Sequence, residues 1–265
     1  MCGRGSRISL GVVLATAALV LAACSCPSDS SESDPVKTEA PEKRGLVAHW
    51  PFDEGEGNVV ADATGSGSDG VIHGASWTTG PTGYALEFDG TDDHVDITPL
   101  PDLASLGEGS IALWFRVDDI PMDNTIEPVF YYGARDSCAN MFDASNQGLV
   151  IELGHHPVLW MSQDLFFTIF SNECSYPSFC YDSGRDISEG VWHHFVAVVG
   201  PDYNTGYLDG EEMVERDYNF GSASSSQFFE DALAHEVLWI GRGFWDATPM
   251  RFDGAIADVR IYDTP

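Results

Sequence analysis

Residues 111–117 read Ile111-Ala112-Leu113-Trp114-Phe115-Arg116-Val117, a stretch in which every second side chain is large and apolar. This period of two is that of a β-strand with one buried face. The same alternation returns in the segment from Trp192 to Val199. Asn204-Thr205-Gly206 and Asp209-Gly210 follow, and their glycines suit tight turns that need a positive φ. These segments predict antiparallel strands joined by hairpins.

Short apolar runs separated by Gly, Asp, Asn and Pro continue this pattern along the chain. Strands are predicted over residues 46–52, 84–88, 94–97, 111–117, 129–132, 149–153, 158–161, 165–170, 192–199, 207–208 with 213–214, 237–241 and 256–262. The helix candidates are short and lie near residues 226–234. About a dozen strands without a long helix indicate an all-β protein, a β-sandwich of two antiparallel sheets in a single domain.

The first 23 residues have the features of a signal peptide. Arg4 and Arg7 give a short positive region, and an apolar stretch from Ile8 to Val20 follows. Leu21-Ala22-Ala23-Cys24 then resembles the bacterial lipobox, in which the cysteine is acylated and becomes the first residue of the mature protein. We therefore expect an exported protein, lipid-anchored through Cys24 in the bacterial cell envelope, at the outer membrane or the cell surface. The alternative is a soluble secreted protein cut elsewhere.

Residues 24–44 form a polar segment rich in Ser, Pro, Glu, Asp and Lys, which is typical of a disordered tether before a folded domain at 45–265. The whole chain has 12 Lys and Arg against 42 Asp and Glu, a net charge of −30. Loss of Arg4 and Arg7 with the signal peptide changes −30 to −32. A chain this acidic repels nucleic acid and anionic lipid, so neither is an expected partner. The acidity fits either a salty habitat or a surface that binds divalent cations.

Four cysteines remain once the signal peptide and the acylated Cys24 are discounted. They are Cys26 in the tether and Cys138, Cys174 and Cys180 in the domain. An even number of cysteines in an exported protein predicts disulfides. Cys174 and Cys180 flank a short loop that a bridge could close, and Cys138 could instead pair with either. A zinc site is the rival, but no paired Cys-x-x-Cys spacing supports it.

An ordered set of motifs resembles the laminin-G-like domain of the concanavalin A-like lectin/glucanase superfamily. The motifs are His49-Trp50-Pro51-Phe52-Asp53-Glu54-Gly55, Asp62-Ala63-Thr64-Gly65-Ser66-Gly67, Ala85-Leu86-Glu87-Phe88-Asp89-Gly90, Ser110 to Phe115, Trp192 to Val198, Tyr207-Leu208-Asp209-Gly210 and Asp253 to Tyr262. They run from about residue 46 to residue 262, and the centre, 136–186, fits least well. The resemblance implies a jelly-roll sandwich that binds a carbohydrate or an extracellular or envelope protein.

The same resemblance implies a structural calcium ion, since such domains often bind one through hard oxygen donors. The acids at the matching positions are Asp53 after the first strand and Asp258 in the last strand, with Asp62 as a third candidate on the neighbouring loop. The chain departs from the pattern at Ala257, where members of the family often carry Asp. That departure puts the last-strand ligand in doubt.

Catalysis is not expected. Related jelly rolls that hydrolyse glycosides need two carboxylates about 5 Å apart, commonly from one strand. The nearest approach is Glu87-Phe88-Asp89-Gly90-Thr91-Asp92, where a Gly-centred turn interrupts the strand. The leading hypothesis is therefore a non-catalytic binding module for a carbohydrate or protein partner. A structural or accessory envelope protein is the alternative, and a polysaccharide-active hydrolase is a minor one.

Overall fold

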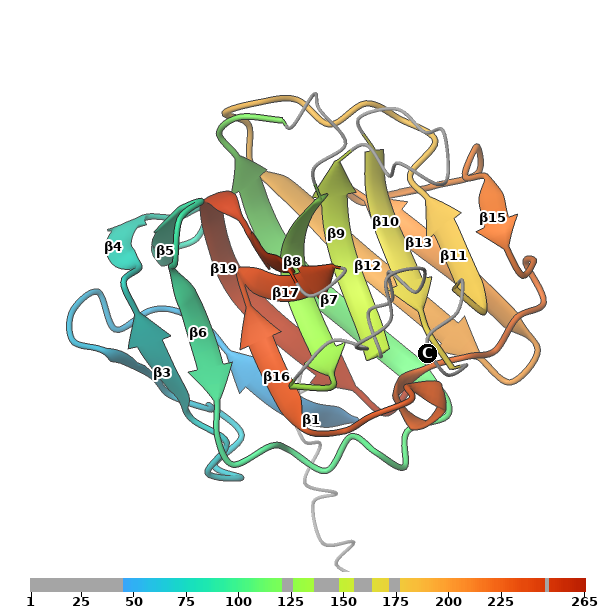
Figure 1. Ribbon diagram of the computed structural model, residues 1–265, viewed down its shortest axis with the longest axis horizontal. Helices are drawn as coiled ribbons and strands as arrows, with labels where there is room; N and C mark the ends of the chain where they lie inside the picture. Colours follow the sequence, from blue (N-terminus) through green and yellow to red (C-terminus); the bar gives the residue numbers. More distant parts are fainter. Residues whose placement is uncertain (1–44, 121–125, 136–147, 155–163, 172–176, 246–247) are drawn as a thin grey trace, which may run out of the picture. The chain divides into compact units, whose positions relative to one another are not determined.

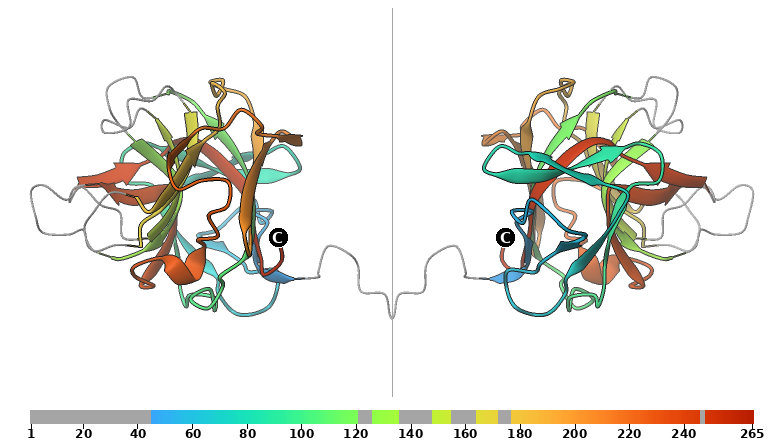
Figure 2. Two further views of the ribbon diagram at one scale, coloured as in Figure 1. Left: turned by 90° about the vertical axis from the view of Figure 1, so that its right-hand side faces the viewer. Right: turned by 90° about the vertical axis from the view of Figure 1, so that its left-hand side faces the viewer.

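The computed structural model describes residues 45–120, 126–135, 148–154, 164–171, 177–245 and 248–265. These residues form two large antiparallel sheets that face each other (Figure 1). Side views show the two sheets as two layers (Figure 2). The predicted all-β sandwich of two antiparallel sheets is confirmed.

Within the described residues, one sheet has eight strands, in the order β14-β13-β12-β7-β19-β5-β4, with β1 also paired to β19. Their bounds are β1 (Leu46–Trp50), β4 (Ser76–Thr79), β5 (Tyr84–Asp89), β7 (Gly109–Val117), β12 (His193–Gly200), β13 (Tyr203–Leu208), β14 (Glu211–Glu212) and β19 (Asp253–Tyr262). The last strand of the chain thus lies between β7 and β5. Long-range pairing of this kind closes the jelly roll.

The second sheet has nine strands in the described part of the chain, in the order β15-β11-β10-β9-β8-β16-β6-β3-β2. Their bounds are β2 (Val59–Val60), β3 (Gly70–His73), β6 (His94–Ile97), β8 (Ile126–Gly133), β9 (Gly148–Gly154), β10 (Asp164–Ile169), β11 (Phe179–Asp182), β15 (Tyr218–Phe220) and β16 (Val237–Ile240). A separate hairpin, β17 (Arg242–Trp245) and β18 (Thr248–Arg251), lies on the outside of this sheet (Figure 2).

The core lies between the sheets, and strand β7 shows how the sequence builds it. Ile111, Leu113, Phe115 and Val117 are all fully buried, while the side chains between them are half-buried. This alternation is the one the sequence predicted. Strands β8 to β11 differ, because every residue in them is buried. Burial on both faces accounts for their near-continuous apolar runs.

One local prediction was wrong. Asn204-Thr205-Gly206 is not a turn but the middle of β13, whereas the turn predicted at Asp209-Gly210 is present, with positive φ at both residues. Gly206 lies in a crowded place: a Cβ there would lie 3.0 Å from Sδ of Met213 and 3.1 Å from the hydroxyl of Tyr181 on the facing sheet. The short helix expected near 226–234 is present as a three-residue 3₁₀ helix, η2 (Phe229–Asp231).

Several predictions fall outside the described residues. These are the signal peptide (1–23), Cys24, the tether (24–44), Cys138, Cys174 and the strand at 158–161. Cys180 is described: it carries a free, fully buried thiol, with Sγ 3.3 Å from Oγ1 of Thr168. Its disulfide pairing stays a prediction. In the part of the chain that the structure covers, no helix has the length and apolarity needed to cross a membrane.

Candidate functional site

The last strand changes neighbours half-way along its length. Its residues Asp253 to Ile256 pair with β5, and its residues from Val259 onward pair with β1. Its opposite edge pairs with β7 throughout, with an irregular register between Ala257 and Arg260. Strands β1 and β5 therefore lie along the same edge of β19, one after the other. Between their ends, beside Asp258, the sheet edge is interrupted.

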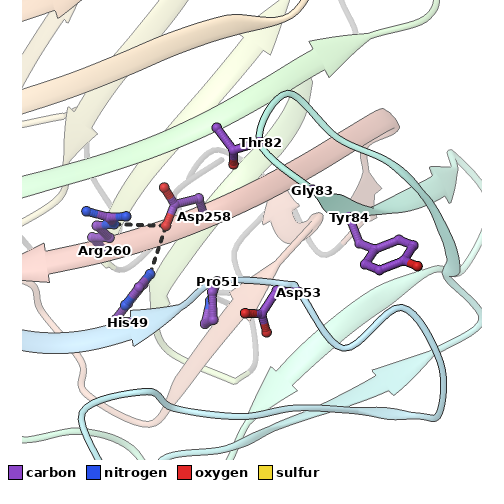
Figure 3. A pocket seen from close by; sticks show the side chains of 8 residues that line it. All are labelled: His49, Pro51, Asp53, Thr82, Gly83, Tyr84, Asp258 and Arg260. Atoms are coloured by element: carbon purple, nitrogen blue, oxygen red, sulfur yellow. Dashed lines mark hydrogen bonds and ion pairs between the residues drawn. The ribbon is translucent and has the colours of Figure 1, made fainter.

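A pocket of about 140 Å³ occupies this interruption (Figure 3). It is lined by His49 of β1, Pro51 and Asp53 after it, Thr82 and Gly83 before β5, Tyr84 at the start of β5, and Asp258 and Arg260 of β19. Figure 3 shows Asp258 with His49 and Arg260 at one end and Tyr84 at the other. The lining is mostly polar and comes from three separate parts of the chain.

Two unusual backbone conformations flank the pocket. In the described residues, Phe52, Asp209 and Asp258 are the non-glycine residues with positive φ, at 55°, 56° and 51°. This conformation is strained for a bulky side chain such as phenylalanine. Phe52 is fully buried, and its turn leaves the next residue, Asp53, exposed at the mouth of the pocket. Strain of this kind concentrates at functional sites, so its presence on both sides of one pocket marks that pocket as a candidate.

Asp258 is held by two hydrogen bonds. Nε2 of His49 and Nε of Arg260 each donate to its Oδ1 at 2.8 Å, and the side chain of Asp258 is only 18% exposed. Because a carboxylate only accepts, Nε2 of His49 carries a proton. Burial raises the pKa of Asp258. The hydrogen bonds from His49 and Arg260 lower it by more than burial raises it, so the net shift of the pKa is downward. The pocket therefore holds a fixed, ionised carboxylate beside a guanidinium.

Asp62 is hydrogen-bonded within its own loop and to β1. It is 6% exposed, and its Oδ1 accepts the backbone N–H groups of His49 (3.2 Å) and Thr64 (3.0 Å). Its Oδ2 accepts the hydroxyls of Thr64 (2.6 Å) and Ser66. These bonds lower its pKa despite the opposing effect of burial. Asp62 therefore stabilises its own loop and holds the backbone of His49 in place. It does not line the pocket.

The predicted calcium ligands therefore do not come together as a three-acid site. Asp53 and Asp258 share the pocket, but Asp62 is turned into its own loop and Asp258 already has a guanidinium partner. A positive charge beside a carboxylate opposes a second cation there. Among the described residues, the group of three acids whose oxygens lie within 4.8 Å of one another is Asp89, Asp92 and Asp93, which the sequence did not single out as metal ligands. Calcium binding by the chain stays a prediction.

Replacing Asp62 with alanine should lower the free energy of unfolding by about 2–4 kcal/mol, because two backbone N–H groups lose their acceptor. An Asp53→Ala control removes an exposed carboxylate and should change stability by no more than about 0.5 kcal/mol. Since the pKa of Asp62 is lowered in the fold, its contribution is present above the ordinary value of 3.8 and is lost as pH falls below it. Urea denaturation at neutral pH and at about pH 3 measures both effects. Equal losses in the two variants would contradict this role.

The acids considered for hydrolysis occupy the outer side of β5. Glu87 accepts a hydrogen bond from Nη2 of Arg116 at 2.6 Å, and Asp89 accepts one from the N–H of Thr91 at 2.8 Å. Strand β5 ends at Asp89, so Asp92 lies beyond it, as the Gly-centred turn predicted. That the protein is not an enzyme stays a prediction.

The fold and these contacts define a jelly-roll β-sandwich with a polar pocket at one sheet edge. A laminin G family model, described as concanavalin A-like lectin/glucanases superfamily, matches residues 89–265. The chain belongs to this family, as the motifs predicted, although the matched range begins after the first of them. Among curated proteins no sequence matches significantly.

Solved structures share the fold. Domain 4 of AbnA, a GH43 extracellular arabinanase from Geobacillus stearothermophilus in complex with arabinotriose, is 20% identical with a TM-score of 0.54, covering 82% of this chain and 91% of that one. Trypanosoma rangeli sialidase in complex with sialic acid is 14% identical with a TM-score of 0.52, covering 83% of this chain and 31% of the sialidase. The receptor binding domain of botulinum neurotoxin C/D mosaic serotype is 10% identical with a TM-score of 0.53, covering 83% and 48%. The chain thus spans less than half of the last two. Likeness at these identities shows the fold alone.

Proposed function

We propose that this protein is a non-catalytic carbohydrate-binding module that holds a single sugar unit in the pocket between β1, β5 and β19. The observation that carries the proposal is a pocket with an exposed tyrosine at one end and a set of fixed polar groups at the other. Tyr84 is 51% exposed, which is unusual for a large aromatic side chain. Aromatic faces stack on the apolar faces of sugar rings, while nearby polar groups bind the hydroxyls.

The ring of Tyr84 is already in place. A Cβ built on Gly55 would lie 2.6 Å from Cε2 of Tyr84, so the ring rests against the backbone of Gly55. Gly55 has a φ of 70° and faces the ring without a side chain of its own. A ring supported in this way loses little conformational entropy when a ligand stacks on it.

The polar end of the pocket offers both donors and acceptors. Asp258 supplies fixed carboxylate oxygens, Arg260 supplies N–H groups, and Asp53 supplies a second, exposed carboxylate. Hydroxyls of a neutral sugar can donate to the carboxylates and accept from the guanidinium. The volume of about 140 Å³ is below that of typical pockets for drug-sized ligands, which favours one sugar unit over a long oligosaccharide.

The family and one neighbour also favour a carbohydrate ligand. The superfamily description includes lectins, and the arabinanase domain was solved with arabinotriose. We extend the proposal to location: lipid attachment at Cys24 would place the module at the bacterial envelope, where polysaccharides are accessible. A structural or accessory envelope protein without glycan binding is the alternative.

Glycan-array screening should identify a sugar, and Asp53→Ala and Tyr84→Ala should each weaken its binding at least about tenfold, or 1.4 kcal/mol. Neither change removes a buried group, so the melting temperature should stay near that of the wild type. Tyr203→Ala is the matched control, because Tyr203 is 42% exposed on β13, away from the pocket. Isothermal titration calorimetry with that sugar measures the affinity of each of the three variants. Undiminished binding in both pocket variants would place the sugar elsewhere, and a silent array with co-purifying envelope proteins would support the alternative.

A further inference from the structure

A cluster of basic side chains lies where the β17–β18 hairpin covers the outside of the nine-stranded sheet. The hairpin packs on β8, since a Cβ on Gly243 would lie 2.8 Å from Cγ of Pro128. Arg242 of β17 and Arg251 of β18 are directly opposite each other in the hairpin register. Like charges in directly opposite positions destabilise a strand pair. The register therefore brings two arginines together at one place in the hairpin.

Arg242 is oriented by the sheet below. Its guanidinium carbon lies 4.4 Å from the centroid of the Trp239 ring, and its Nη1 lies 3.3 Å from Nε2 of His94. The ring of His94 stacks on that of His73, with centroids 4.6 Å apart and planes 14° apart. His73 is exposed and His94 is half-buried, so the cluster reaches the surface.

His94 is neutral in this arrangement. Its Nδ1 lies 2.9 Å from the backbone oxygen of Asp92. A carbonyl oxygen only accepts, so Nδ1 carries the proton and Nε2 accepts from Arg242. Burial lowers the pKa of His94, and Arg242, His73 and Arg251 lower it further, against the raising effect of the Asp92 carbonyl.

Arg251 lacks the carboxylate partner that several arginines of this acidic protein have. Arg116, Arg185, Arg216 and Arg260 each have a carboxylate within 4.0 Å. Across the described residues Arg251 has no such ion pair; its Nη1 donates to the backbone oxygen of Met250 at 3.0 Å, and its Nε is buried without a hydrogen-bond partner. With 42 acidic residues against 12 basic ones, a carboxylate could readily have been placed there.

We propose that Arg242, Arg251 and His94 form a binding site for an oxyanion, the carboxylate of an acidic sugar or a sulfate ester. A guanidinium presents paired N–H groups that match two oxygens of such an anion. The anion would give Nε of Arg251 the acceptor that it lacks. The site lies on a different sheet from the sugar pocket and does not depend on the proposed function.

Binding at this site is linked to pH. An anion beside His94 favours the charged imidazolium, so the anion binds more tightly where His94 takes up a proton. The other charged or titratable groups that act on the cluster are His73 on β3, Asp92 and Asp96 around β6, Arg135 after β8, and the two hairpin arginines themselves. The negative charges of Asp92 and Asp96 weaken anion binding, and the positive charge of Arg135 strengthens it.

The test is a titration of the full chain with sodium sulfate and, separately, sodium glucuronate, at an ionic strength held constant with sodium chloride. NMR resonances of the His94 ring and the Trp239 indole should shift and saturate, and binding should be at least about threefold tighter near pH 5 than near pH 8. Saturation by glucuronate but not by sulfate identifies a carboxylate ligand, and the reverse identifies a sulfate ester. If neither anion moves these resonances beyond the chloride control, the proposal is wrong.

Variants distinguish binding at this site from a general effect of the protein's charge on anions. Arg251→Gln should weaken anion binding at least about tenfold. Arg251→Lys keeps the charge but loses the paired donors, so its affinity should lie between those of the wild type and the glutamine variant. Arg185→Gln is the matched control, because Arg185 lies elsewhere on the surface beside Glu211. Equal weakening by Arg251→Gln and Arg185→Gln would overturn the site. The lysine variant keeps the test valid if the glutamine variant does not fold.

Discussion

Replacing Gly254 with alanine should lower the free energy of unfolding by more than about 4 kcal/mol, or prevent folding. Gly254 has a φ of 148°, and a Cβ there would lie 2.0 Å from the backbone oxygen of Arg116. The obstacle is backbone, so no side chain can rotate away. Gly254 also pairs with Phe88 of β5 and Val117 of β7, so it cannot move without disturbing two strand pairings at once.

Gly210→Ala provides the matched control for this effect. Gly210 has a φ of 79°, so alanine is also strained there, but a Cβ would meet nothing within 4 Å. Its loss should be about 1 kcal/mol, the conformational penalty alone. Equilibrium denaturation of both variants isolates the steric part. If Gly254→Ala and Gly210→Ala lowered the free energy of unfolding by amounts within about 1 kcal/mol of each other, the backbone of β7 at Arg116 would be able to move away from the added Cβ.

The strands could be predicted where one face is buried. Strand β7 is an example: its period of two places Ile111, Leu113, Phe115 and Val117 in the core as expected. Prediction failed where local composition and long-range packing disagree. Strand β11 reads Phe-Cys-Tyr-Asp and was missed, because two of its four residues are polar or cysteine and its other face is buried as well. Asn204-Thr205-Gly206 has the composition of a turn but is a strand, because all three residues pair with β12.

The site was only partly accessible from the sequence. Asp53 and Asp258 were found through the family motifs, and they do share a pocket. Tyr84 and Arg260 were not assigned to any site, because their proximity depends on β19 exchanging β5 for β1 at Asp258. That exchange is a long-range pairing which no local pattern encodes. The basic cluster is similar: His94 and Arg242 are 148 residues apart in the chain.

Two buried glutamates predict that the protein loses stability as pH rises. Glu127 is 8% exposed and accepts the backbone N–H of Asp253 at 3.2 Å, which ties β8 to the start of β19. Burial, aided by Asp253 and Asp119, raises its pKa from 4.5 to about 8 against the effect of that hydrogen bond. Glu152 is 1% exposed, and burial raises its pKa from 4.5 to about 7, although Thr168 donates a hydrogen bond to it.

Both groups hold a proton in the folded protein that the unfolded chain releases above about pH 4.5. The stability that these two groups contribute is therefore greatest at or below that pH and declines until about pH 8, where Glu127 ionises in the fold as well. One pKa unit corresponds to about 1.4 kcal/mol, so the two shifts together amount to on the order of 8 kcal/mol. His94 and His194, whose pKa values burial lowers, act in the opposite direction near pH 6 and reduce the observed slope.

A Glu127→Gln, Glu152→Gln double variant removes this dependence. Glutamine resembles the protonated acid, and its amide oxygen can still accept from Asp253 and Thr168. The variant should be more stable than the wild type by several kcal/mol at about pH 8, and the two should converge near pH 4.5. Urea denaturation across this range gives the difference, in which the histidine contributions cancel. Glu215→Gln, a change at an exposed position, should keep the wild-type profile. A double variant whose stability follows the wild-type slope would show that neither carboxyl is protonated in the folded protein at neutral pH.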